Sequence, residues 1–282
     1  MPSSIPILRF PLLPLEEILK CMGIAESLQL SKCSKRVARL VPLAGKFYRL
    51  RVSPNTTKAN YDSKMTQSSL NCDPDDLVRM LETFQCGIQE IETRSDAPTE
   101  ELSNLINEIS KLPIKKFKLN GIGISSADLK IVLEKVDFLK LNISSFDISF
   151  TEFQVFPKHI ELLHSHRIPF SDLLSFKSCV SIVLYDSHFT NSDLDMLLDH
   201  WQSGAFPNLE LLRIFGDRMD HDQQLRGFSG WPRKEVDRLN EKSINDGKYY
   251  FNGGEEIRRF DGARAVVQLH KNFVMFVYLE EI

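Results

Sequence analysis

The chain has 282 residues, of which 42% are hydrophobic, and its formal net charge is −3. This length and composition predict a sizeable core, arranged as one large domain with a small one or as two domains. Strongly basic proteins favour binding to nucleic acid or to membrane surfaces, and this chain lacks such a charge. No stretch approaches the roughly 18 consecutive apolar residues of a membrane-spanning helix.

The five cysteines are scattered along the chain and form no Cys-x-x-Cys pair: they are Cys21, Cys33, Cys72, Cys86 and Cys179. This usage is typical of buried free thiols in a reduced intracellular compartment. We do not expect the opening residues to form a signal peptide, because Pro14, Glu16 and Glu17 interrupt the apolar run. We therefore expect a cytoplasmic or nuclear protein.

Residues 10–41 predict three short helices. Apolar residues spaced i, i+3, i+4 and i+7 mark the first helix, and they are Leu15, Ile18, Leu19 and Met22. Pro14 suits its first turn, a second helix is expected over residues 25–33, and a third from Ser34. Three short helices cannot enclose a core alone. Their apolar faces must therefore pack on the rest of the chain, on another protein, or on both.

This region resembles an F-box of the kind expanded in nematodes. The resemblance covers about forty residues and rests on FPLLPLEEILKCM and LQLSKCSKRVARLV. Its most specific parts are Leu13-Pro14, Ile18-Leu19, Leu30-Ser31 and Cys33-Ser34-Lys35-Arg36. The chain departs from the family at residues 23–27, where F-boxes commonly have an Asp-Pro-x-x-Leu turn.

The F-box resemblance implies that residues 10–45 dock on the Skp-type adaptor of a cullin ubiquitin ligase. It implies that the following residues supply the contact or its backing: Leu13, Pro14, Leu15, Ile18, Leu19, Leu28, Leu30, Cys33, Lys35, Arg36 and Val37. Lys35 and Arg36 would meet acidic groups at the rim. For Leu19, Leu30 and Val37, a role only in holding the three helices together stays open.

Residues 31–64 are rich in Lys and Arg, with Asp62 as the only acidic residue. This positive charge is typical either of a surface that binds a nucleic-acid phosphate backbone or of an ordinary solvated face of the protein. No aromatic stacking pattern accompanies it, so we expect a solvated face and no nucleic-acid partner. Residues 47–52 alternate as a strand does, whereas the following polar run has no periodicity. We therefore predict an F-box module over 1–52, a linker over 53–72, and a second domain over 73–282.

From Asp73 onwards, amphipathic helices alternate with short apolar strands. The predicted helices cover residues 77–84, 102–109, 129–136 and 194–201, with a shorter one after Ser171. Their expected N-caps are Asp73, Thr99, Ser125 or Ser126, and Ser192. The predicted strands are 88–91, 117–119, 139–143, 160–163, 182–184 and 209–214. Such alternation predicts parallel strands joined by right-handed crossovers.

The strands recur at intervals of 21–28 residues, the period of leucine-rich repeats. The crossover between Leu141 and Leu162 lacks a helix signal and is expected to be irregular. A doubly wound nucleotide-binding sheet has the same alternation, but Gly121-Ile122-Gly123 lacks the rest of its phosphate-binding fingerprint. We therefore favour a leucine-rich-repeat-like solenoid.

The end of the chain predicts a cap for this array. A short helix is expected over residues 232–240. Two strands over 256–260 and 265–269 flank Asp261-Gly262, a pair that suits a tight hairpin turn. A third strand is expected over 273–279, so that an antiparallel meander covers the last repeat.

The second half of the chain is similar to the type-2 F-box-associated domain. The similarity rests on Trp201, Gly204 and the run from Phe206 to Leu212, and on the run from Ile257 to Ala263. It covers about Ile114 to Leu279. The family commonly follows an F-box and is regarded as a substrate- or partner-binding module, so the resemblance implies that this part of the chain holds a target protein.

A search for catalytic or metal-binding residues gives none that we assign. His159, His164 and His166 cluster, but they lack a nearby carboxylate or cysteine in a suitable pattern and are expected to be exposed loop residues. Cys179 has an apolar flank typical of a core thiol. Trp201 lies on a helical stripe and is expected in the core. The Glu255-Glu256 pair is expected to face water. We expect no catalytic residue, no metal and no cofactor.

Together these features predict an α/β (α+β) chain: a short three-helix F-box, then a leucine-rich-repeat-like α/β solenoid, then a C-terminal antiparallel β meander. The predicted function is substrate recognition in an SCF-type cullin ubiquitin ligase, with a Skp-type adaptor, a cullin scaffold and an unknown protein substrate as partners. Two alternatives stay open: a ligase-independent interaction protein with a degenerate F-box, and an enzyme with a nucleotide site at the strand ends.

Overall fold

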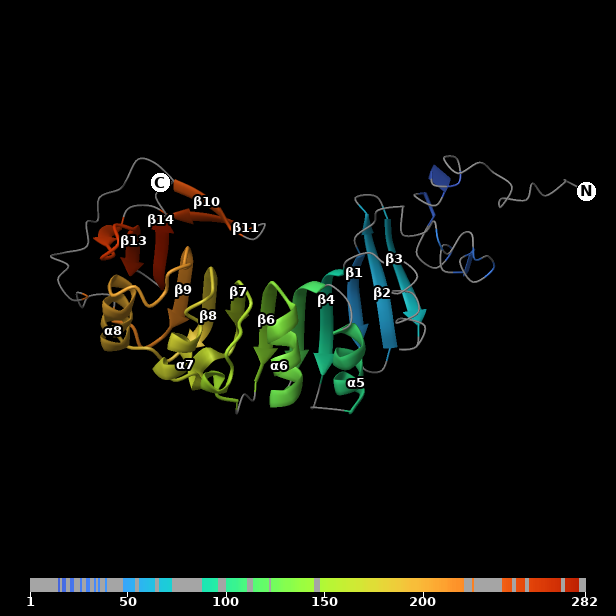
Figure 1. Ribbon diagram of the computed structural model, residues 1–282, viewed down its shortest axis with the longest axis horizontal. Helices are drawn as coiled ribbons and strands as arrows, with labels where there is room; N and C mark the ends of the chain where they lie inside the picture. The colour runs from blue at the N-terminus through green and yellow to red at the C-terminus, as the bar shows by residue number, and fades with distance from the viewer. Residues whose placement is uncertain are drawn as a thin grey trace, which may run out of the picture. The chain divides into compact units, whose positions relative to one another are not determined.

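The computed structural model describes the chain in segments and divides it into two compact units, residues 1–136 and residues 137–282. The described residues are 15, 17–18, 21–22, 26, 29–30, 33, 35, 39, 48–53, 56–63, 66–72, 88–95, 100–110, 114–121, 123–144, 148–220, 225, 240–244, 247–251, 254–269 and 272–278. Figure 1 labels the elements of both units.

The first unit contains a mixed sheet. Its described strands are β1 (Tyr48–Ser53), β2 (Thr56–Ser63), β3 (Thr66–Cys72), β4 (Ile88–Ser95) and β5 (Ile114–Gly121). They lie in the order β5-β4-β1-β2-β3. β4 is parallel to both β5 and β1, whereas β2 is antiparallel to β1 and β3. The predicted strands at residues 47–52, 88–91 and 117–119 are therefore confirmed.

Two helices pack with the sheet of the first unit. They are α5 (Glu100–Ile109) and α6 (Ser126–Lys135), and both lie on one face of β4 and β5 (Figure 1). Ser125 caps α6, because its Oγ accepts a hydrogen bond from the Asp128 N–H at 3.1 Å. The buried Asp128 carboxylate accepts hydrogen bonds from Ser125 at 2.6 Å and from Ser103 of α5 at 2.7 Å, which joins the two helices.

The polar run predicted as a linker forms strands instead. β2 and β3 occupy residues 56–63 and 66–72 and pair over seven residue positions. The runs TTKANYDS and TQSSLNC are mostly polar. They lack the clear alternation of apolar and polar residues on which strand prediction depends. The predicted domain boundaries at residues 52 and 72 stay predictions.

The second unit contains parallel strands followed by antiparallel ones. The strands that share its main sheet are β6 (Phe138–Ile143), β7 (His159–Leu162), β8 (Ser181–Ser187), β9 (Leu211–Gly216), β12 (Glu255–Arg258), β13 (Arg264–Leu269) and β14 (Phe273–Tyr278). β6 to β9 are parallel and lie in sequence order. β10 (Asn240–Ile244) and β11 (Gly247–Phe251) form a separate hairpin, which the sequence did not predict.

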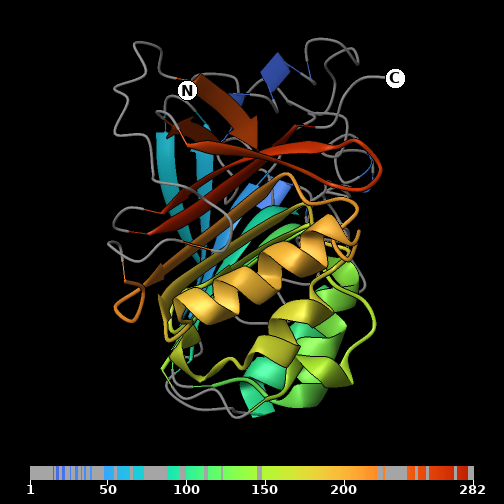
Figure 2. The same cartoon turned by 90° about the vertical axis from the view of Figure 1, so that its left-hand side faces the viewer.

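The crossovers of the second unit lie on one face of β6 to β9. They contain the 3₁₀ turns η3 (Phe150–Glu152) and η4 (Ser165–Arg167), and the helices α7 (Phe170–Ser175) and α8 (Asn191–Gln202). Figure 2 shows α8 lying along this face. Alternate residues of β6 and β7 are buried, in the patterns iBiBiB and iBiB, so one face of these strands forms the core with the crossovers. The irregular crossover predicted between Leu141 and Leu162 is confirmed by η3.

The C-terminal meander joins the open edge of β9. β14 pairs antiparallel with β9, from Phe273 opposite Ile214 to Phe276 opposite Leu211, and β13 pairs with β14 and β12. Gly262 has a φ of +96°, which fits the tight turn predicted at Asp261-Gly262. The prediction of an antiparallel meander at this end is confirmed.

One predicted helix start in the second unit was wrong. Thr190, not Ser192, is the N-cap of α8. The Thr190 side chain accepts from the Asp193 N–H at 3.4 Å, and the Asp193 carboxylate accepts from the Thr190 N–H at 2.8 Å. This reciprocal capping box satisfies two backbone donors. A single hydroxyl at Ser192, two residues after the observed N-cap, cannot do so.

Several predictions fall outside the described residues. These are the helix at residues 77–84 with its cap Asp73, the cap Thr99, and most of the helix at 232–240, of which Asn240 begins β10. Scattered positions between 15 and 39 are helical, and the three-helix arrangement stays a prediction. Within the described segments, every helix falls short of the length and hydropathy required to cross a bilayer.

Candidate interaction surface

The N-terminal candidate is described at isolated positions. Leu15 is fully buried, and Ile18 and Leu30 are half-buried, whereas Cys33 and Lys35 are exposed. A shallow surface hollow is lined by Glu17, Ile18, Cys21, Met22 and Glu26. The other residues predicted to bind the adaptor lie outside the described positions: Leu13, Pro14, Leu19, Leu28, Arg36 and Val37. Adaptor binding by this set stays a prediction.

In the second unit, a buried arginine connects the hairpin turn after β12 to the segment after α8. The Arg259 guanidinium pairs with the Asp261 carboxylate, with Nε–Oδ1 and Nη2–Oδ2 distances of 2.8 Å each. Its Nη1 donates to the carbonyl oxygens of Phe206 at 3.0 Å and Pro207 at 3.4 Å. The guanidinium carbon lies 5.5 Å from the ring centroid of Trp201. We call this set of contacts the Arg259 latch.

The Arg259 latch holds the hairpin turn in one conformation. The Arg259 N–H donates to the Ala263 carbonyl at 2.8 Å, and the Ala263 N–H donates to Asp261 Oδ1 at 3.1 Å. These contacts favour the ionised carboxylate: the side-chain hydrogen bond from Arg259 is the largest cause that lowers the pKa of Asp261. The turn is therefore fixed by charge-assisted bonds on both sides of Phe260.

The turn presents Phe260 to solvent next to the C-terminal end of α8. The Phe260 N–H donates to the Gln202 carbonyl at 3.2 Å. Its ring lies against Gly204, where a Cβ atom would collide with it, and Gly204 has a φ of +89°. Trp201 is fully buried, so the prediction that it belongs to the core is confirmed. The exposure of Phe260 was not predicted, because the sequence pattern placed this residue at the end of a strand over residues 256–260.

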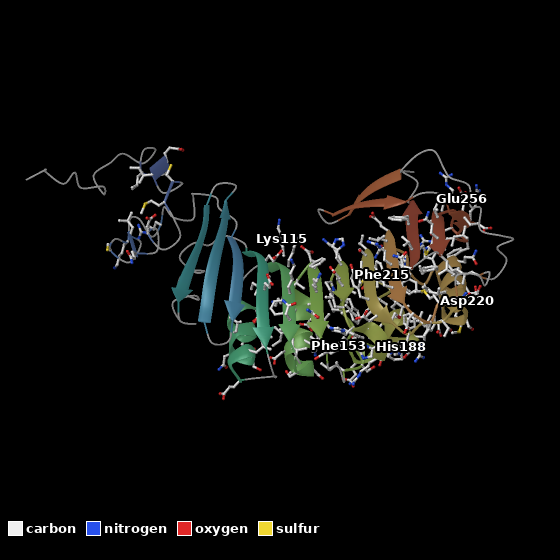
Figure 3. The ribbon with its side chains drawn as sticks, turned by 180° about the vertical axis from the view of Figure 1, so that it is seen from behind. Lys115, Phe153, His188, Phe215, Asp220 and Glu256 are labelled. Carbon is white, nitrogen blue, oxygen red and sulfur yellow. The ribbon has the colours of Figure 1, made fainter. Side chains whose placement is uncertain are left out.

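Aromatic and cationic side chains meet on the strand face opposite the helices. Tyr185 and Phe215 stack with ring centroids 4.6 Å apart and planes at 6°, and the Arg213 guanidinium carbon lies 4.8 Å from the Phe215 ring centroid (Figure 3 labels Phe215). The register of β8 against β9 shifts between Leu184 and Ser187. Asp186 within this irregularity has a φ of 55°, as residues at a β-bulge sometimes have.

Three histidines gather beyond the ends of β7 and β8. His164 Nδ1 lies 3.2 Å from the Asp186 carboxylate. The ring centroids of His164 and His166 are 6.4 Å apart, and those of His166 and His188 are 5.5 Å apart (Figure 3 labels His188). His164 and His166 are half-buried and His188 is exposed. Among the described residues, no three His, Cys, Asp or Glu side chains are arranged to hold a metal ion.

Cys179 and the pair Glu255-Glu256 were the other side chains considered for a catalytic role. Cys179 is buried, its thiol donates to the Pro157 carbonyl at 3.1 Å, and burial raises its pKa to about 12. The core position predicted for Cys179 is confirmed. The two glutamates after Gly254 differ: Glu256 is exposed as predicted, whereas Glu255 is half-buried, and desolvation raises its pKa. The expectation that both face water was therefore wrong for Glu255.

Comparison with known protein families gives a match in the second half of the chain. A family model described as F-box associated matches residues 130–214, which run from α6 to β9. No curated protein and no solved structure matches the chain. The matched segment contains Phe206, whose carbonyl oxygen accepts a hydrogen bond from Arg259. Arg259 itself lies outside that segment. It agrees with the type-2 F-box-associated domain predicted over about Ile114 to Leu279, and residues 130–214 are thus similar to that family.

Proposed function

We propose that the chain is a substrate-recognition subunit of an SCF-type cullin ubiquitin ligase. The observation that carries this proposal is the match of residues 130–214 to the F-box-associated family. The F-box-like sequence of residues 10–45 precedes it in the chain, in the order expected for such subunits. In this proposal the N-terminal three-helix module binds a Skp-type adaptor, and through it the cullin, while the second domain binds a protein target.

The proposed role is positioning. Holding a target beside the charged conjugating enzyme raises the effective concentration of its lysine side chains at the transfer site. The bond-making steps then belong to partner proteins, and the chain needs no catalytic residue, metal or cofactor. The proposed compartment is the cytoplasm or the nucleus, where the ligase acts.

The parallel array of β6 to β9, with crossovers on one face, supports the further proposal of a leucine-rich-repeat-like solenoid. Each repeat in such an array contacts its sequence neighbours, as β7 does with β6 and β8. The pairing of β14 with β9 fits the cap that repeat arrays need at their last member.

Co-purification of the full chain with a Skp-type adaptor tests the proposed function. Deletion of residues 10–45 should abolish adaptor and cullin recovery, because these residues supply the predicted contact. The matched control is Phe260→Ser in the full chain, which changes an exposed residue far along the sequence and should leave adaptor recovery unchanged. Undiminished adaptor binding by the deletion variant would contradict the proposal.

A ligase-independent interaction protein is the second candidate function. The altered turn at residues 23–27 favours it, since the usual Pro and Leu of this F-box segment are replaced by Ile24 and Ser27. Recovery of a target protein without any cullin in the same pull-down would support this alternative over the first.

A further inference from the structure

The hairpin turn that the Arg259 latch holds contains the dipeptide Asp261-Gly262, a sequence that can rearrange to isoaspartate. The main-chain nitrogen that follows an aspartate can attack the aspartate Cγ, and glycine favours this attack because it has no side chain to cover the nitrogen. A Cβ atom at Gly262 would have nothing within 4 Å, and Asp261 and Gly262 are both exposed. Neither crowding nor exclusion of water therefore protects this dipeptide.

The rearrangement needs water and no other reactant. The lone pair of the Gly262 nitrogen forms a bond to Cγ of the protonated Asp261 carboxyl group. The nitrogen loses its proton, the bond from Cγ to the hydroxyl oxygen breaks, and one water molecule leaves. A second water molecule then opens the resulting succinimide ring at either carbonyl carbon. Attack at Cγ restores aspartate, whereas attack at the main-chain carbonyl carbon leaves isoaspartate.

The Arg259 latch restrains both reacting groups. The two Asp261 carboxylate oxygens accept hydrogen bonds from the Arg259 guanidinium at 2.8 Å each, and Oδ1 also accepts from the Ala263 N–H at 3.1 Å. These bonds hold the carboxyl group in its ionised form, whose oxygen is a poor leaving group, and they oppose rotation of Cγ toward the nitrogen. The Gly262 N–H itself donates to the Arg259 carbonyl at 3.0 Å.

The arginine side of the latch is anchored in the core. Arg259 is buried, its Nη1 donates to the Phe206 carbonyl at 3.0 Å, and its guanidinium carbon lies 5.5 Å from the ring centroid of Trp201. The exposed Asp261 carboxylate is thus held by a cation that other contacts fix in place. Attack on Cγ therefore requires that the turn first opens locally.

From these contacts we propose that Asp261-Gly262 is an isoaspartate-forming modification site that the Arg259 latch keeps closed. Modification proceeds from the fraction of molecules in which the turn is open, so isoaspartate at position 261 records opening of the latch. The isoaspartyl residue has one more main-chain atom and a shorter carboxylate arm, which no longer match the pairing with Arg259. This inference goes beyond the proposed function and does not depend on it.

Incubation of the purified full-length chain in heavy-oxygen water tests the inference. Each passage through the succinimide inserts one heavy oxygen atom at position 261, whichever product forms, and peptide mapping by mass spectrometry measures the label. The native chain should label Asp261 at least about tenfold more slowly than the same chain in denaturant, because the loss of one charge-assisted hydrogen bond changes an open population by about this factor. Equal rates in the two states would overturn the inference.

Arg259→Lys shows whether the latch itself is responsible. This substitution keeps a cation but removes the fork that binds both carboxylate oxygens, so labelling of Asp261 in the folded variant should rise several-fold. The matched control lies in the same molecule: Asp246-Gly247 is a second Asp-Gly dipeptide of the sequence, and its labelling should stay unchanged. An unchanged rate at Asp261 in the folded variant would overturn the inference. If the variant does not fold, the comparison of native and denatured chains decides.

Discussion

Arg259, in the turn after β12, contacts residues that lie far from it in the sequence. Arg259 reaches the carbonyl of Phe206, which is 53 positions away in the chain. Sequence patterns could place Asp261-Gly262 in a turn, because the residue types needed there are local. They could not show that Arg259 is buried, since its partners are backbone carbonyls and a ring brought together only by the fold.

Two glycines with positive φ allow a matched test of the Phe260 position. Gly204→Ala and Gly262→Ala should each lower the free energy of unfolding by about 1–2 kcal/mol, because both residues occupy the left-handed region. Only the Gly204 substitution also meets a neighbour, the Phe260 ring, whereas a Cβ at Gly262 has nothing within 4 Å.

The extra cost of Gly204→Ala should therefore disappear in a Phe260→Ser background, as a double-mutant cycle in denaturant would show. Equal costs for both glycines with and without Phe260 would mean that the ring does not lie against Gly204 in solution.

The Arg259–Asp261 pair predicts a defined pH dependence of stability. The pKa of Asp261 is lowered in the folded chain, chiefly by the hydrogen bond from Arg259, so the unfolded chain takes up the proton first as pH falls. The stabilisation should be fully present above the ordinary aspartate pKa of about 3.9 and be lost as pH falls through the lower folded value.

Denaturant midpoints of the native chain and of Asp261→Asn, measured from pH 7 to pH 2, check this prediction. The two midpoints should differ at pH 7 and converge in acid. A difference that stays constant over the whole range would show that the carboxylate charge does not contribute.

At the scale of elements, the sequence predicted the parallel part of the second unit well and the hairpins less well. β6 to β9 could be predicted because each is a short apolar run between helical patterns. α8 could be predicted because its buried residues recur at helical spacing. β2 and β3 could not be predicted, because their sequences are mostly polar and lack a clear alternation of apolar residues. The start of α8 was misplaced although Thr190 and Asp193 have the spacing of a capping box, which a search for paired signals would have found.

The capping box of α8 gives a prediction with its own control. Thr190→Ala should lower the free energy of unfolding by about 1 kcal/mol, because it removes the acceptor for the Asp193 N–H and the donor to the Asp193 carboxylate. Ser192→Ala, two residues further on and exposed, should change it by less than about 0.5 kcal/mol. Denaturant midpoints followed by circular dichroism measure both. A larger cost for Ser192→Ala than for Thr190→Ala would contradict the assignment of Thr190 as the cap.

For the whole molecule, the proposed function separates two binding activities along the chain. In this proposal, residues 10–45 bind the adaptor and the second domain binds the target. Deletion of residues 10–45 should remove adaptor binding and spare target binding. The N-terminal residues that support the first assignment came from a family resemblance, whereas Phe260 became visible only when the fold showed which side chains stay exposed.

The pairing of β14 with β9 has a consequence for synthesis of the chain. β9 ends at Gly216, and the strand that covers its edge begins at Phe273, about 60 residues later. At ribosomal rates of 5–20 residues per second, this interval lasts roughly 3 to 12 s. Throughout it, the apolar edge of β9 lacks its final neighbour, and unprotected edges of this kind recruit other strands. Nascent chains stalled between these two strands, and products of premature termination there, should therefore be the most aggregation-prone forms of this protein and the ones that most need chaperone protection.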